Sequence, residues 1–80
     1  MELEKLKLYR VTKGSSDHTY RKGDIIWLSN NDDLNSCQGA GWLSKDEWDA
    51  PGTNDFEVEE CKDYYLDVSR GHEAVRRKMV

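Results

Sequence analysis

The stretch that decides the fold is residues 22–28, KGDIIWL. Its first three residues favour a turn, and four apolar residues follow without a break. Four residues are too few for a stable helix, and isoleucine and tryptophan favour strands. We therefore expect residues 25–28 to form the central strand of a sheet. An unbroken apolar run predicts burial on both faces, with Trp27 in the core.

Strand patterns lie on both sides of this segment. Residues 5–13 alternate apolar and polar side chains, with a change of phase that predicts a bulge near Leu8 or burial on both faces. Residues 56–68 form the longest β pattern, and we expect it to be split near residues 60–62. Gly71 should end that pattern.

One short helix and an ambiguous tail complete the chain. Ser44 and Glu47 have the spacing of a capping box, which predicts a helical turn at residues 44–49 with Trp48 packed inward. Pro51 and Gly52 should end it. Residues 72–80 are short and basic, and they fit a helical turn, an edge strand or a frayed tail from residue 70 onward.

These elements predict a mainly β fold of four to six short strands with one helical turn, as a small bent antiparallel sheet or an SH3-like barrel. Residues 22–28, a polar loop and then Gly41-Trp42-Leu43 resemble the strand–loop–strand core of SH3-like barrels. In that core a Gly-Asp pair opens the second strand and a Gly-Trp pair opens the next. The likeness covers about a third of the chain. The peptide-binding motif of true SH3 domains is missing, so binding of proline-rich peptides is not implied.

Length and composition favour one small globular domain over residues 1–80. The chain has 80 residues, 36% of them hydrophobic and 35% charged, with three Trp and four Tyr that can supply buried area. No apolar run approaches the roughly 20 residues that span a membrane, and the first ten residues lack the apolar region of a signal peptide. We expect a cytoplasmic protein, in the host cell if it is phage-encoded, with Cys37 and Cys61 as reduced thiols.

Charges are sorted by position along the chain. Residues 1–22 carry an excess of 3 positive charges, residues 24–67 an excess of 10 negative charges, and residues 70–80 again an excess of 3 positive charges. Like charges crowded on a small surface repel one another, so such a block suggests a role in solubility or a cationic partner. The acidic block is therefore the leading candidate for a binding surface.

The candidate residues combine this block with two aromatic side chains at its edge. Alternate residues of a strand lie about 6.8 Å apart, roughly twice the axial rise per phosphate in one DNA strand, so strand-borne carboxylates can imitate a phosphate backbone. A polar outer face that only keeps the protein soluble is the alternative. Trp42 and Trp48 either pack against the helical turn or anchor a partner. The candidates are Asp46, Glu47, Asp49, Asp55, Glu57, Glu59, Glu60, Asp63, Trp48 and Trp42.

Other chemistries find little support in the residues. The potential zinc ligands contain no closely spaced pair, and the oxygen-rich loop at residues 30–35 does not follow the EF-hand frame. No nucleophile motif or phosphate-binding glycine loop occurs. We therefore expect no enzyme, no metal site and no cofactor. The four potential zinc ligands are His18, Cys37, Cys61 and His72.

These observations predict a non-catalytic interaction module. In size, acidity and lack of catalytic motifs the chain resembles small phage or mobile-element inhibitors, including anti-CRISPR and DNA-mimic proteins. That resemblance implies a basic, nucleic-acid-binding groove as partner, such as that of a CRISPR effector, and it transfers no individual residue. An SH3-like structural or regulatory module without charge mimicry is the alternative. A third hypothesis is nucleic-acid binding through the basic termini, which the central acidic block opposes. The chain is expected to be a monomer or a homodimer.

Overall fold

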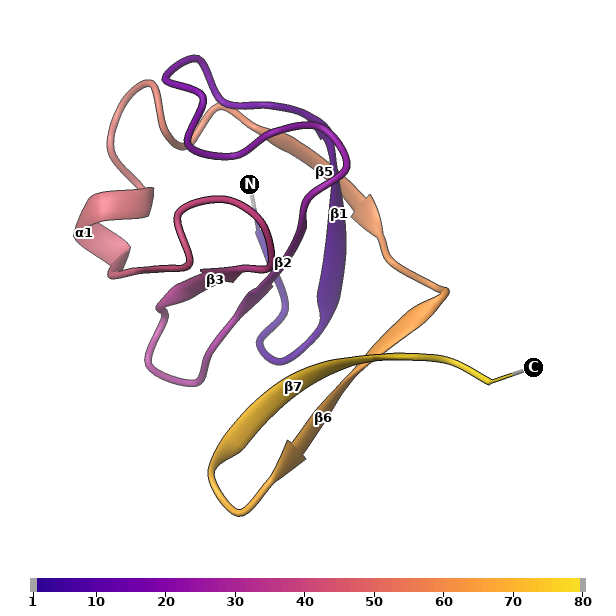
Figure 1. Ribbon diagram of the computed structural model, residues 1–80. Helices are drawn as coiled ribbons and strands as arrows, with labels where there is room; N and C mark the ends of the chain where they lie inside the picture. Colours follow the sequence, from indigo (N-terminus) through magenta and orange to yellow (C-terminus); the bar gives the residue numbers. More distant parts are fainter. Residues whose placement is uncertain (1, 80) are drawn as a thin grey trace.

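The computed structural model describes residues 2–79. Within that range the chain forms seven short strands and one helical turn (Figure 1). They are β1 (Leu8–Lys13), β2 (Ile25–Leu28), β3 (Leu34–Ser36), β4 (Trp42–Leu43), α1 (Lys45–Trp48), β5 (Glu57–Glu60), β6 (Tyr64–Ser69) and β7 (His72–Arg77). The predicted mainly β class is confirmed, although the strands number seven instead of four to six. No helix in this range is long and apolar enough to cross a membrane.

Five strands form the main sheet, in the order β4-β3-β2-β1-β5, and every neighbouring pair is antiparallel. The segment that decides the fold is β2, which lies at the centre as predicted. Between residues 2 and 79 no closed barrel is detected, because β4 and β5 remain at opposite edges. Of the two architectures expected, the open antiparallel sheet is the one that forms.

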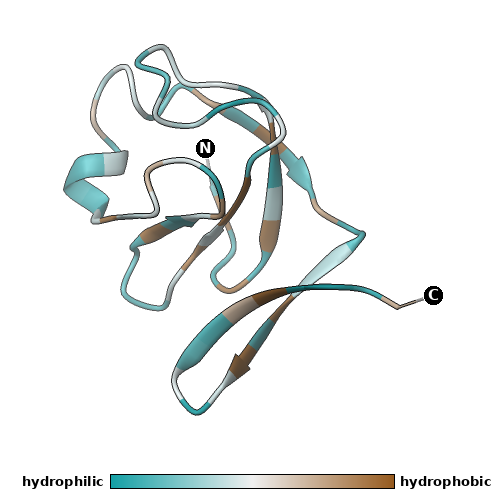
Figure 2. Ribbon diagram, viewed as in Figure 1, coloured by the Kyte–Doolittle hydropathy of each residue, from teal (hydrophilic) through white to brown (hydrophobic). Residues whose placement is uncertain are grey.

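The core lies on one face of the main sheet, which we call the core face. Ile26 and Leu28 point into it, and Tyr20 packs against Phe56 with ring centroids 4.9 Å apart. Figure 2 shows hydrophobic segments in β1, β2 and β3, the strands that supply residues to the core. α1 closes this face by placing Trp48 in the core. The buried core consists of Val11, Tyr20, Ile26, Leu28, Leu34, Trp48 and Phe56.

Trp27 corrects the prediction that β2 is fully buried on both faces. Its neighbours in the strand, Ile26 and Leu28, are buried, whereas Trp27 is half-buried on the opposite face, which we call the outer face. Side chains alternate along a strand, so the four-residue apolar run divides between the two faces. Trp27 is therefore not a member of the core.

β1 is shorter than the strand predicted over residues 5–13. Leu6 has a left-handed backbone (φ 60°), which L-residues with large side chains rarely adopt, and the ladder begins only at Leu8. Lys5 makes an isolated bridge to Leu28. The irregularity in the ladder lies between Val11 and Lys13, beside β5, and not near Leu8. The other predicted alternative, burial on both faces, is the one that the structure has, since Val11 is buried in the core and Leu8 on the outer face.

β6 and β7 pair along their whole length and form a second, two-stranded sheet, which we call the arm. The split predicted near residues 60–62 is confirmed, since β5 ends at Glu60 and β6 begins at Tyr64. Arg70 and Gly71 form the turn, both with positive φ (51° and 77°), as tight hairpin turns require. Of the three conformations considered for the tail, residues 72–77 adopt the strand and are not frayed.

The arm lies across the outer face of the main sheet. One carboxylate oxygen of Glu73 accepts hydrogen bonds from the Trp27 indole (3.0 Å) and the Ser29 hydroxyl (2.9 Å). Leu8 pairs with Trp27 in register and is buried on this side, outside the core cluster. α1 and the arm therefore cover opposite faces of the main sheet.

Candidate functional site

The acidic residues of β5 lie beside a basic strand. β5 pairs with β1, and the register places Glu59 opposite Arg10 and Glu57 opposite Lys13. Because residues directly opposite in an antiparallel pair project to the same side, Glu57 and Glu59 do share a face as the alternation predicted. That face also carries the two cations of β1.

Ion pairs neutralise two of the three carboxylates of β5. The ammonium of Lys13 lies 3.6 Å from the Glu57 carboxylate, and that of Lys7 lies 3.0 Å from Glu60. The Lys7 hydrogen bond lowers the pKa of Glu60, as expected for a carboxylate stabilised in its charged form. The proposed phosphate-like track along β5 is thus interrupted by the chain's own lysines.

Asp63, just beyond β5, is engaged in the same way. A hydrogen bond from the Cys61 thiol (3.4 Å) lowers its pKa, and the nearby Arg10 guanidinium (3.4 Å) contributes in the same direction. Arg10 also lies over the Tyr64 ring, 5.9 Å from its centroid. These contacts fix the start of the arm against β1.

The acidic residues around α1 behave differently. Asp46 and Asp49 are exposed, and no lysine or arginine of residues 2–79 lies within 4 Å of either carboxylate. Glu47 forms the predicted capping contacts, accepting from the Ser44 backbone N–H (3.2 Å) and hydroxyl (2.8 Å). Its negative charge is therefore held at the start of the helix without a cation.

Two loops bring further carboxylates to this end of the molecule. Asp55 accepts hydrogen bonds from the backbone N–H (2.9 Å) and the hydroxyl of Ser16, which lower its pKa. The Asn54 side chain donates to the backbone carbonyl of Asp49 (3.0 Å), which holds this loop against the end of α1. The loop before β5 therefore places Asp55 close to the acids of α1.

Asp17 belongs to the same cluster, although sequence reasoning missed it. The Thr53 hydroxyl donates to its carboxylate (2.5 Å), and this bond, helped by the Thr19 N–H (3.0 Å), lowers the pKa of Asp17. Its own N–H donates to the Gly52 carbonyl (3.0 Å). Residues 14–17 have the composition of a turn, and their approach to residues 52–55 is a tertiary contact that no local pattern indicates. We call Asp17, Asp46, Glu47, Asp49 and Asp55 the acidic end.

The two candidate tryptophans separate. Trp48 is 8% exposed, and its indole donates to the Asp32 carbonyl (2.8 Å), so it packs inward as predicted and offers no surface to a partner. Trp42 is 58% exposed on the edge strand β4, with its indole donating to Asp33 (2.6 Å). Only Trp42 therefore remains a candidate anchor.

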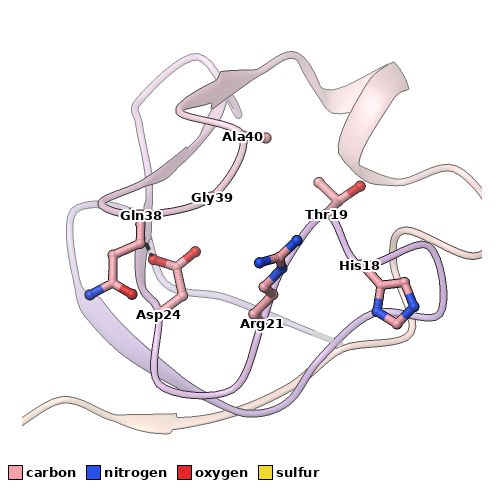
Figure 3. A pocket seen from close by; sticks show the side chains of 7 residues that line it. All are labelled: His18, Thr19, Arg21, Asp24, Gln38, Gly39 and Ala40. Atoms are coloured by element: carbon pink, nitrogen blue, oxygen red, sulfur yellow. Dashed lines mark hydrogen bonds between the residues drawn. The ribbon is translucent and has the colours of Figure 1, made fainter.

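A cavity of about 410 Å³ lies between the β1–β2 and β3–β4 loops (Figure 3). Asp24, 2% exposed, forms one wall and accepts from the Gln38 N–H (3.0 Å) and the Ser36 hydroxyl (2.5 Å). Figure 3 shows the Arg21 guanidinium between Asp24 and Thr19. Both oxygens of Asp24 thus hold the loop, which is a structural task.

Cysteine and metal chemistry receive no support within residues 2–79. Cys37 and Cys61 are free, and burial raises the pKa of each thiol, which disfavours the reactive thiolate. No group of three or more His, Cys, Asp or Glu side chains in this range is placed to hold a metal ion.

Comparisons with protein-family models, with curated proteins and with solved structures found no match for this chain. The candidate surface is therefore defined by the residues and contacts described above.

Proposed function

We propose that this chain is a non-catalytic protein-binding module that docks its acidic end on a basic surface of another protein. One observation carries the proposal. Two of the three carboxylates of β5, Glu57 and Glu60, form ion pairs with lysines, whereas those of the acidic end have no cationic partner within 4 Å among residues 2–79. Such unpaired, exposed charges steer a cationic partner at long range and favour complementary docking.

The acidic end replaces the β5 track as the contact surface. Asp46 and Asp49 lie beyond the reach of Lys13 and Lys7, the cations that hold Glu57 and Glu60. A lysine or arginine of a partner can therefore bind them without first breaking an ion pair. Hydrogen bonds to Asp17 and Asp55 keep those two carboxylates ionised and fixed, which limits the entropy lost on binding.

The partner that best fits this chemistry is a basic nucleic-acid-binding groove, such as that of a CRISPR effector, which the module would occupy as an inhibitor. Small size, acidity and the lack of a catalytic constellation support this form of the proposal. An enzyme of that class works in the cytoplasm, so the proposal places the chain there.

Affinity capture from lysate of the source cells tests the proposal. Three baits are compared: the unchanged chain, Asp46→Asn with Asp49→Asn, and Glu57→Gln with Glu60→Gln as the matched control. Both variants remove two negative charges, so the net charge changes equally. We expect the acidic-end variant to capture at least tenfold less partner than the unchanged chain, and the control to capture nearly as much. Added salt should weaken capture by the unchanged chain.

Equal capture by the acidic-end variant and the unchanged chain would refute the acidic end as the docking surface. A captured partner without a basic, nucleic-acid-binding groove would refute the inhibitor form alone. Mass spectrometry of the captured protein separates the two outcomes.

Trp42 favours a second candidate function, an SH3-like protein-binding module without charge mimicry. A tryptophan that is 58% exposed on an edge strand is unusual for a solvent-facing position and typical of interface anchors. This candidate predicts capture that is insensitive to salt and is lost in Trp42→Ser, while Asp46→Asn with Asp49→Asn has no effect.

A further inference from the structure

The arm carries a surface that the proposed function does not use. Its face bearing Glu73 lies against the main sheet, where Glu73 binds Trp27 and Ser29. The opposite face carries Tyr65, which is directly across from Arg76 and is 43% exposed. This outward face lies on the other side of the main sheet from α1.

The carboxylates of the arm are all engaged. Asp67 forms an ion pair with Arg76 (2.6 Å), and Asp63 forms one with Arg10 of β1 (3.4 Å). Glu73 is held by its two hydrogen bonds to the main sheet. None of these negative charges is left to oppose an anionic ligand on the outward face.

Several cations in and beside the arm, in contrast, form no ion pair with a carboxylate. Across residues 2–79, no Asp or Glu lies within 4 Å of the side-chain nitrogens of Lys62, Arg70, Arg77 and Lys78. At the N-terminal end of the chain, Lys5, Lys7, Arg10 and Lys13 all form ion pairs. Four cations in and beside the arm are thus available to an anionic ligand.

A groove of about 640 Å³ runs along this basic surface. It combines an exposed aromatic ring with two guanidinium groups, the set of groups on which unpaired bases stack and which bind phosphate. The pairing of Tyr65 with Arg76 keeps ring and guanidinium adjacent. The groove is lined by Tyr65, Val75, Arg76, Arg77 and Met79.

We propose that the arm binds single-stranded nucleic acid along this groove, with Tyr65 stacking on a base and Arg77 and Lys78, at the end of β7, contacting phosphates. Stacking requires a base whose faces are open, which a duplex does not offer within its stack. The acidic end lies on the opposite side of a molecule 36 Å long, and its repulsion is screened within about 8 Å at physiological salt. The acidic end is therefore distant from the arm in the fold.

Fluorescence anisotropy of a labelled oligothymidylate of about 12 nucleotides tests the proposal at about 50 mM salt with the full chain. Arg77→Glu with Lys78→Glu should weaken binding at least tenfold and flatten its salt dependence. The matched control is Lys22→Glu with Lys45→Glu, which changes the net charge equally away from the arm and should have little effect. Tyr65→Thr, which keeps a strand-forming residue, should weaken binding several-fold.

No binding by the unchanged chain would overturn the proposal. Equal losses in the arm variant and the control would also overturn it, because attraction would then be a property of overall charge. The proposal would also be overturned if a polyglutamate peptide bound as tightly as the oligothymidylate. It would be overturned as well if a duplex of the same sequence bound as tightly and Tyr65→Thr left the affinity for the single strand unchanged. Circular dichroism of each variant verifies that the strands are intact.

Discussion

At the scale of single residues, Tyr20 contains an unusual group. Its side chain is fully buried against Phe56, and its hydroxyl has no hydrogen-bond partner among residues 2–79. Burial raises the pKa of this phenol above its ordinary value near 10, so the group stays neutral in the folded state. A buried hydroxyl without a partner costs about 1–3 kcal/mol of folding free energy. The ring of Tyr20 therefore stabilises the core, whereas the hydroxyl of Tyr20 destabilises it.

Tyr20→Phe should therefore keep or increase the free energy of unfolding, by up to about 1 kcal/mol, in urea titrations. Tyr9→Phe is the control, because the Tyr9 hydroxyl accepts the Glu4 N–H (2.9 Å), and this variant should lose up to about 1 kcal/mol. A loss in Tyr20→Phe as large as that of Tyr9→Phe would show that the Tyr20 hydroxyl has a partner.

Asp17 is one of four carboxylates that make the stability of the folded protein depend on pH. Its pKa and those of Asp55, Glu60 and Asp63 are lowered in the folded state, so the folded state binds fewer protons than the unfolded state near pH 4. Their contribution to stability is complete above the unfolded pKa values, about 4, and is lost as the pH falls through the lower folded values. Asp17→Asn should be less stable at pH 7 and show a flatter decline in urea midpoint between about pH 5 and pH 2 than the unchanged chain.

Gly39 occupies a position where any side chain would collide. A Cβ there would lie 2.7 Å from the Thr19 carbonyl oxygen and 2.9 Å from both the Asp24 carboxylate and the Ser36 hydroxyl. We expect Gly39→Ala to lower the free energy of unfolding by about 2 kcal/mol. Gln38→Ala should be nearly neutral, because Gln38 holds Asp24 through its backbone N–H. Thermal melts of the two variants check the difference.

At the scale of elements, the arm depends on one carboxylate for its docking. Glu73→Ala leaves the Trp27 indole without its acceptor, which should cost about 1–2 kcal/mol. Hydrogen exchange should then accelerate in β6 and β7 and stay unchanged in β2, because the arm has its own hairpin ladder and shares little of the core. Glu59→Ala is the control. Equal acceleration in all strands of Glu73→Ala would indicate that the arm and the main sheet unfold together.

Elements with local signals could be predicted from the sequence, and those fixed by distant partners could not. β2, the capped turn at Ser44 and the break after Glu60 each follow from neighbouring residues. The half-burial of Trp27 could not be predicted, because the group that covers it, Glu73, belongs to a strand whose sequence also fits a helical turn or a frayed end.

The same distinction between local signals and distant contacts explains which features of the candidate site could be predicted. Alternation alone predicted that Glu57 and Glu59 share a face. Which strand lies beside β5 depends on the whole topology, so the ion pair between Glu57 and Lys13 of β1 could not be anticipated. Asp17 joined the acidic end through a contact with Thr53 that no local pattern encodes.

At the scale of the whole molecule, the two proposed surfaces have opposite charge and lie on opposite faces of the main sheet. Contacts between unlike surfaces of successive copies do not close on themselves, so chains of molecules can form at low salt. We expect weak, concentration-dependent association at about 20 mM salt that disappears at about 300 mM. Sedimentation velocity measures this association, and the variant Arg77→Glu with Lys78→Glu should remain monomeric at both salt concentrations. A dimer that persists at high salt would contradict this expectation.

The position of β1 between β2 and β5 also constrains the order in which the chain folds during its synthesis. β2 follows β1 after an eleven-residue loop, whereas β5 begins more than forty residues after the end of β1, so the hairpin of β1 and β2 can form first. Closing that long loop is slow compared with forming hairpins. Until the ribosome has released β5, the nascent chain exposes a basic strand edge, and the acidic residues that later cover it provide an electrostatic attraction that favours the correct last strand.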